Sequence, residues 1–217
     1  MLDAIFLYFS GFLGKVELAG TIFSLICVYL AVKHNIWTWF WGALGVICFG
    51  YLFYEYKLYS DAGLQILFFL PMQLWGWRVW TNTCAASGEK TTKTLSDLSG
   101  ATFYLVPPAV LIGVGVLTAT FINGGLMAKY TDASFPYVDA LTTWMSITAQ
   151  ILMIKKYWES WVVWISMDVI AIFVYLAKGL AVTSGLYVVF LVLATMGLYA
   201  WYKDWKKANV PHLGDLA

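Results

Sequence analysis

The sequence predicts an all-α membrane protein with seven transmembrane helices in a 3+1+3 arrangement, in which one linker helix joins two parallel three-helix repeats. Of the 217 residues, 61% are hydrophobic and only 12% are charged, whereas a soluble domain carries about 25% charged residues. Seven apolar segments approach the roughly 20 residues that a bilayer span requires. The first and last parts of the chain also align with each other without gaps.

Short polar turns separate most of the expected spans, and one long polar stretch divides them into two groups. The apolar run near the N-terminus is too short to span a bilayer, so we expect it to lie at the membrane interface. It lacks a basic start and a small-residue cleavage motif, which argues against a removed signal peptide. The expected spans are 16–33, 36–54, 61–79, 101–122, 138–154, 158–177 and 180–202. The expected organisation is an interfacial segment (1–15), a first repeat (16–80), a flexible cytoplasmic loop (81–100), the linker helix (101–122), an extracytoplasmic loop (123–137), a second repeat (138–202) and a cytoplasmic tail (203–217).

The two repeats correspond at one offset of about 122 residues, with charged, hydroxyl and tryptophan positions in register. Because three helices is an odd number, a directly fused second copy would be inverted, and one extra helix restores the parallel orientation. Transporters with parallel repeats bind substrate near the bilayer midplane, at the interface of the repeats. The aligned pairs include Glu17 with Asp139, Thr21 with Thr143, Ser24 with Ser146, Lys33 with Lys155, Trp39 with Trp161 and Gly63 with Gly185.

The basic residues predict the orientation of the chain. Most of them fall on one expected face, which the positive-inside rule places in the cytoplasm. The N-terminus is then outside and the C-terminus inside. The cytoplasmic set is Lys33, Arg78, Lys90, Lys93, Lys155, Lys156, Lys203, Lys206 and Lys207, and the opposite set is Lys15, Lys57, Lys129 and Lys178.

Asp168 lies near the middle of the sixth expected span, within "VVWISMDVIAIF". A carboxylate at mid-bilayer costs about 2.5–3.5 kcal/mol on insertion scales, so it should face a watery cavity, a ligand or a partner. Trp164 lies one turn earlier on the same side. We expect both to contact the ligand; the alternative for Asp168 is a structural pair with a polar neighbour.

The fifth expected span carries a polar stripe on one helical face, formed by Asp139, Thr142 or Thr143, Ser146 and Gln150. The Thr and Ser side chains are also typical of helix–helix contacts. Gln150 is larger and deeper, and we include it among the candidate ligand-binding residues.

In the third span, "PMQLWGWRVW" places Gln73 and Trp77 on one helical face. The offset of 122 pairs Gln73 with Thr195 and Trp77 with Tyr199. A hydrogen-bonding group beside an aromatic ring suits a flat, cationic ligand. An aromatic belt at the membrane interface explains Trp75 and Trp80, and is the alternative for Trp77. Pro71 is expected to kink this helix.

Several functions are excluded by what the sequence lacks. The net charge of +1 gives no reason to expect nucleic acid as a partner, and His34 and His212 are too few and too far apart for a metal site. "SGEKTT" lacks the glycine and Gly-Lys-Thr core of a phosphate loop. No catalytic constellation or cofactor motif is found, so the chain is not expected to be an enzyme.

The segments "LYSDAGLQILFF", "WGWRVW", "SFPYVDA" and "MIKKYWESWVVWISMDV" resemble the Pnu family of vitamin transporters, over residues 16–205. The resemblance implies a seven-helix 3+1+3 fold similar to the SWEET sugar transporters. It also implies uptake across the bacterial inner membrane by facilitated diffusion, with a cytoplasmic kinase that phosphorylates and traps the vitamin.

The resemblance favours nicotinamide riboside as the substrate and leaves thiamine as a rival. Trp161 and Trp164 match the family pattern, whereas Gln73, Asp168 and Met196 replace asparagines of nicotinamide riboside members. The expected partners are a small cationic vitamin and membrane lipid, with a homo-oligomer as a further option. A receptor or assembly subunit that does not transport is the alternative from another functional class. The candidate substrate-binding residues are Gln73, Trp77, Gln150, Trp164, Asp168, Thr195 and Tyr199.

Overall fold

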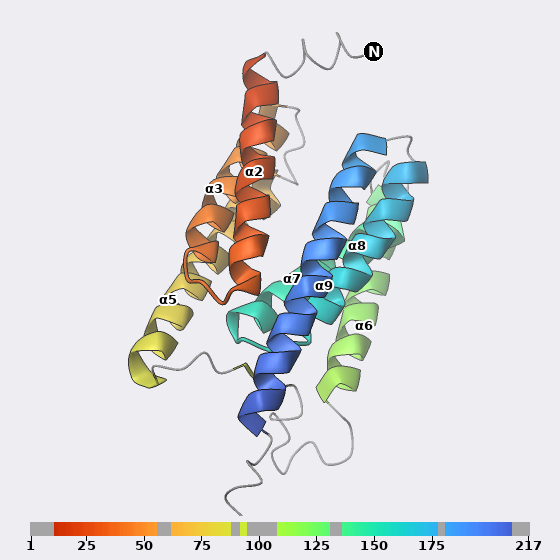
Figure 1. Ribbon diagram of the computed structural model, residues 1–217. Coiled ribbons are helices and arrows are strands. Elements are labelled where there is room, and N and C mark those ends of the chain that lie inside the picture. The colour runs from red at the N-terminus through yellow and green to blue at the C-terminus, as the bar shows by residue number, and fades with distance from the viewer. Residues whose placement is uncertain are drawn as a thin grey trace, which may run out of the picture. The chain divides into compact units, whose positions relative to one another are not determined.

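The computed structural model describes residues 11–55, 62–87, 92–94, 108–130, 136–177 and 181–209, and this part of the chain is almost entirely helical (Figure 1). The chain divides into two compact units, Met1–Lys90 and Thr91–Ala217. The all-α class predicted from composition is confirmed. The first unit contains α2 (Phe12–Val32), α3 (Thr38–Glu55) and a long helix that begins as the π-helix η1 (Leu64–Phe69) and continues as α5 (Leu70–Ser87). The second unit contains α6 (Pro108–Tyr130), α7 (Pro136–Ile154), α8 (Ser160–Ala177) and α9 (Ala181–Asn209).

Three of the described helices are long and apolar enough to cross a membrane, namely Phe12–Val32, Ala109–Tyr130 and Ser184–Ala208. A shorter apolar helix covers Ser160–Val174. α3 has 18 residues and α7 has 19, close to the roughly 20 residues that a span requires.

Several helices extend beyond their expected ends. α2 begins at Phe12, inside the expected interfacial segment, and α5 continues to Ser87, inside the expected loop 81–100. α9 continues to Asn209, inside the expected tail. Parts of the expected segments and some of the expected basic positions lie outside the described residues, namely at 1–10, 56–61, 88–91, 95–107, 178–180 and 210–217.

α6 also runs past its expected end, to Tyr130, through the glycine pair at positions 124 and 125. A Cβ added to Gly124 would lie 2.5 Å from a ring carbon of Tyr137 at the start of α7. Gly124 therefore allows α6 and α7 to approach closely and does not end the helix, so residues 123–130 and 136–137 of the expected loop 123–137 are helical, and residues 131–135 lie outside the described residues.

The turn between α2 and α3 has the same backbone geometry as the turn between α7 and α8. Each contains a non-glycine residue in the left-handed region, His34 with φ of 53° and Lys156 with φ of 63°. These positions are 122 residues apart, the offset found in the sequence. Both turns close in the manner of a Schellman motif, through amide-to-carbonyl bonds from Asn35 to Leu30 at 2.9 Å and from Tyr157 to Leu152 at 3.0 Å.

In the first unit, α3 and α5 cross at two tryptophans and a glycine. The rings of Trp39 and Trp80 are buried and contact edge to face, with centroids 5.2 Å apart. A Cβ added to Gly76 would lie 2.4 Å from the Trp39 ring, so the close approach requires glycine. Trp80 is therefore a core residue, and its assignment to an aromatic belt is wrong. Trp75 is exposed, as a belt residue would be.

The second unit repeats this crossing between α8 and α9. The rings of Trp161 and Trp201 are buried, with centroids 5.6 Å apart, and a Cβ added to Gly197 would lie 2.5 Å from the Trp161 ring. Trp39 and Trp161 are 122 positions apart in the sequence. The glycines and tryptophans that contact them on α5 and α9 are only 121 positions apart. Gly76 thus corresponds to Gly197, and Trp80 corresponds to Trp201.

The π-helix η1 explains this change of register. Before η1, buried Ala62 and Ser184 still correspond at the offset of 122. A π-helical turn contains more residues than an α-helical turn, so η1 places one additional residue in the first unit ahead of α5. The distortion expected at Pro71 is therefore present as a π-helix that ends two residues earlier.

The shifted register changes the partners of two candidate residues. It pairs Gln73 with Ala194 and Trp77 with Leu198. The pairings of Gln73 with Thr195 and of Trp77 with Tyr199, expected from the ungapped alignment, are therefore wrong.

Candidate substrate-binding site

Gln73 of α5 is the most buried candidate residue of the first unit, with 8% of its surface exposed. Its carboxamide lies against Gly42 of α3, where an added Cβ would be 2.6 Å from Oε1 and 2.9 Å from Cδ. Among the described residues, Gln73 Oε1 has no hydrogen-bond partner. An unsatisfied buried carbonyl oxygen is costly, so this atom is suited to accept a hydrogen bond from a ligand.

Cys27 of α2 and Thr38 of α3 complete this polar group. The Thr38 hydroxyl donates to the Cys27 carbonyl oxygen at 2.7 Å and lies 3.3 Å from the Cys27 sulfur. That sulfur would be 3.0 Å from a Cβ on Gly42. Side chains of α2, α3 and α5 thus meet beside the Gln73 carboxamide. We call Cys27, Thr38, Gly42 and Gln73 the Gln73 cluster.

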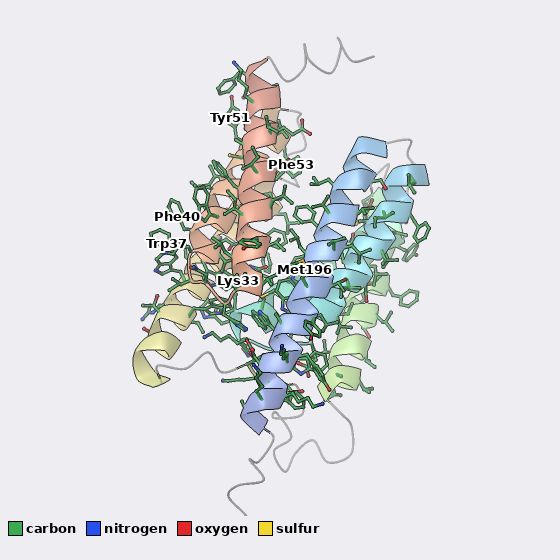
Figure 2. The ribbon with its side chains drawn as sticks, viewed as in Figure 1. Lys33, Trp37, Phe40, Tyr51, Phe53 and Met196 are labelled. Atoms are coloured by element: carbon green, nitrogen blue, oxygen red, sulfur yellow. The ribbon has the colours of Figure 1, made fainter. Side chains whose placement is uncertain are left out.

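Trp77, one turn after Gln73, lies in a different environment. Its ring contacts the Trp37 ring edge to face, with centroids 5.5 Å apart. Trp37 is exposed and also contacts exposed Phe40 at 5.7 Å (Figure 2). This surface group of rings favours the aromatic-belt alternative for Trp77.

Asp168 of α8 is the most buried charged candidate in the second unit, with 4% of its surface exposed. Within the described part of the chain, no hydrogen bond or ion pair joins its carboxylate to another residue. The described residues therefore provide no polar partner for Asp168, and the alternative of a structural pair is not supported. Trp164, one turn earlier on α8, is half-buried. A carboxylate and an indole on one helix suit a cationic ring.

The polar stripe of α7 mainly serves the helix itself and its packing. The Thr143 hydroxyl donates to the Asp139 carbonyl oxygen at 2.8 Å. The Ser146 hydroxyl lies 2.8 Å from the Thr142 carbonyl oxygen and 2.9 Å from the Met167 sulfur on α8. These contacts favour the helix-packing alternative for the hydroxyl residues.

Gln150 lies at the same end of α7 as the turn to α8 and is buried, with 8% exposed. The Ser146–Met167 contact holds α7 beside the α8 residue that precedes Asp168. Gln150 and Asp168 therefore belong to two helices in direct contact.

Thr195 and Tyr199 lie on an exposed face of α9. The Thr195 hydroxyl donates to the Leu191 carbonyl oxygen of its own helix at 2.8 Å. Tyr199 is 69% exposed, and the Lys203 ammonium lies 5.8 Å from its ring centroid. No described contact joins either side chain to Gln150 or Asp168.

The role of Gly42 was not predicted from the sequence. The chain has 18 glycines, and tryptophan stands 122 positions after Gly42, at Trp164. The alignment of the repeats therefore did not indicate that Gly42 must be small.

Among the described residues, no group of three or more His, Cys, Asp or Glu side chains could hold a metal ion.

A family model described as "Nicotinamide mononucleotide transporter" matches residues 14–203. The chain is 29% identical over 208 residues to the nicotinamide riboside transporter PnuC of Escherichia coli (strain K12), covering 87% of this chain and 85% of that protein. It is 24% identical over 201 residues to the riboflavin/roseoflavin transporter RibM of Streptomyces davaonensis, covering 91% and 89%.

The structure is similar to a crystal structure of the vitamin B3 transporter PnuC. The TM-score is 0.66 at 23% sequence identity, and the match covers 89% of this chain and 83% of that chain. This likeness shows a shared fold.

Proposed function

This chain belongs to the nicotinamide mononucleotide transporter family, and from that premise we propose that it takes up nicotinamide riboside across the bacterial inner membrane. Because the family consists of membrane transporters, the chain is not an enzyme. The observation that carries the substrate is the similarity to the Escherichia coli nicotinamide riboside transporter over 87% of this chain. Buried Asp168, one turn after Trp164 on α8, supports it, because nicotinamide riboside carries a pyridinium cation.

The transport is facilitated diffusion by alternating access, and a cytoplasmic kinase traps the vitamin by phosphorylation. Two parallel three-helix repeats, joined by α6, carry it out, with the N-terminus outside and the C-terminus in the cytoplasm. The recurring turns at His34 and Lys156 and the recurring crossings at Gly76 and Gly197 support the two repeats.

In this proposal Asp168 neutralises the cationic ring and Trp164 stacks on it. Gln73 and Gln150, both buried amides, bind polar groups of the vitamin. Trp77, whose ring contacts exposed Trp37, is assigned to the aromatic belt at the membrane interface. The change of register removes the symmetry argument that introduced Thr195 and Tyr199, so we assign them at most peripheral contacts.

Uptake into proteoliposomes tests the proposal, with labelled nicotinamide riboside, thiamine and riboflavin supplied separately to purified protein. Faster entry of nicotinamide riboside than into protein-free vesicles, saturating with concentration and needing no ion gradient, is the expected result. Strict dependence on an imposed proton or sodium gradient would overturn facilitated diffusion. Specific binding without uptake would support the receptor alternative.

Riboflavin is the second candidate substrate, because the RibM similarity extends over 91% of this chain. Riboflavin has a neutral ring and gives Asp168 no cation to bind. Thiamine carries a thiazolium cation and fits Asp168 as well as nicotinamide riboside does. The same uptake experiment ranks all three vitamins.

A further inference from the structure

We propose that Gly42 is a positioning residue for Gln73, and that the free Oε1 of Gln73 accepts a hydrogen bond from an N–H or O–H group of the transported vitamin. The inference rests on the proposed function and adds both a specificity-determining position and the kind of group that it recognises. It draws only on contacts within the first unit, in the Gln73 cluster.

The space above Gly42 is occupied by the Gln73 carboxamide. A Cβ at Gly42 would lie 2.6 Å from Oε1 and 2.9 Å from Cδ, distances that real Cβ atoms do not adopt. The far end of a glutamine is flexible, so an alanine at Gly42 would displace the carboxamide and leave the helices in place. This differs from Gly76, where the obstacle is a buried, rigid indole ring.

The second unit shows that the glycine is not required by the fold alone. Trp164 stands at the position of Gly42, 122 residues later, and Ala194 stands at the position of Gln73 in the shifted register. The larger side chain therefore comes from α5 in the first unit and from α8 in the second. Gly42 is small because Gln73 is large, and both large residues are candidate ligand contacts.

The chemistry of the free atom defines the group that it would bind. A carbonyl oxygen only accepts hydrogen bonds, so its partner must donate. The neighbouring hydroxyl of Thr38 already donates to the Cys27 carbonyl oxygen. The donor to Gln73 Oε1 is then a carboxamide, amino or hydroxyl group of the vitamin. Nicotinamide riboside carries a carboxamide and hydroxyl groups, and an aminopyrimidine vitamin carries an amino group.

A double-mutant cycle tests the inference with Gly42→Ala, Gln73→Ala and the combined variant, compared in proteoliposome uptake of labelled nicotinamide riboside. Gly42→Ala and Gln73→Ala should each raise KM by about threefold to tenfold, the effect of one hydrogen bond, with the maximal rate little changed. In the combined variant Gly42→Ala should raise KM little further, because it acts mainly through Gln73 and only the Cys27 sulfur, 3.0 Å from the added Cβ, remains close. Gly185→Ala is the matched control, since nothing lies within 4 Å of an added Cβ there.

The same four proteins also give a readout that needs no substrate. Any fall in thermal midpoint caused by Gly42→Ala should be reduced in the combined variant, where the displaced side chain is absent. An unchanged KM in Gly42→Ala, or equal effects of Gly42→Ala with and without Gln73, would overturn the inference. Failure of the proposed function would be distinct, since the wild-type protein itself would then take up no nicotinamide riboside.

Discussion

The ring of Trp161 lies so close to the backbone of Gly197 that a methyl group there would sit 2.5 Å from it. Trp161 is 1% exposed and its ring also contacts the Trp201 ring edge to face, so it has little freedom to move. The distance between α8 and α9 is therefore set by a rigid indole against a bare backbone. Gly76 and Trp39 set the distance between α3 and α5 in the same way.

Gly197→Ala should destabilise the protein by about 1–3 kcal/mol, because a methyl group must be forced into a packed core. The measurement is the thermal midpoint of purified protein in detergent. Gly185→Ala on the same helix is the control and should leave the midpoint unchanged or slightly raised, because its added methyl group meets open space. Equal midpoints for the two variants would contradict the close packing at Gly197.

The fold class and the correspondence of the two units could be read from the sequence, because hydropathy and a fixed offset are properties of the chain itself. The register of α5 could not. An additional residue inside a continuous helix leaves no break in hydropathy. Pro71 indicated that the helix is distorted but did not indicate that the distortion is a π-helix. The offset of the third helices is revealed by the contacts of Gly76 and Trp80 with Trp39, and of Gly197 and Trp201 with Trp161.

Some features of the candidate site could be predicted from the sequence and others could not, because only some of them leave a local pattern. The burial of Asp168 follows from a carboxylate within an apolar run, which is a local signal. The packing of Gly42 against Gln73 joins positions on different helices, and no local pattern reports it. Trp80 was misassigned because tryptophans of the interface and of the core look alike in sequence, and only contact with Trp39 separates them.

The backbone at His34 provides a second prediction, since its φ of 53° lies where most side chains are strained. Asparagine tolerates this conformation, whereas β-branched valine does not. Both His34→Asn and His34→Val remove the imidazole, so their difference isolates the backbone effect. We expect the valine variant to be less stable by about 1–2 kcal/mol. Equal thermal midpoints would show that the turn adopts another conformation.

A third prediction concerns the short segment Thr92–Thr94, which is attached to the turn between α7 and α8. The amide of Lys93 donates to the Lys156 carbonyl oxygen at 2.9 Å, and the amide of Trp158 donates to the Lys93 carbonyl oxygen at 3.1 Å. The Thr94 hydroxyl also donates to the Glu159 carboxylate. Together these bonds tie the segment to the turn from both its backbone and its side chain.

Thr94→Val keeps the shape of the side chain but removes a hydrogen bond to a charged group, worth about 1.5–3 kcal/mol. The segment should detach more often, and trypsin should cleave after Lys93 several-fold faster. Thr94→Ser keeps the hydroxyl and should behave like the wild-type protein. Identical cleavage rates in all three proteins would show that the backbone bonds alone hold the segment.

The last prediction concerns Asp168, whose buried carboxylate has no partner among the described residues. Asp168→Asn removes the charge and preserves the size. If the carboxylate binds a cationic ring, affinity for nicotinamide riboside should fall by about tenfold or more, since a contact between opposite charges at 4 Å is worth about 4 kcal/mol near a protein surface. Binding calorimetry on the purified protein measures this, and affinity for neutral riboflavin should not fall.

Stability should change in the opposite sense, because a buried charge without a partner costs free energy that the neutral amide avoids. The thermal midpoint of Asp168→Asn should therefore equal or exceed that of the wild-type protein in the absence of ligand. Asp139→Asn, at the first turn of α7, is the control for loss of a carboxylate and should leave the affinity unchanged. A lower midpoint with unchanged affinity would assign Asp168 to the architecture of α8 and would remove the carboxylate from the binding site.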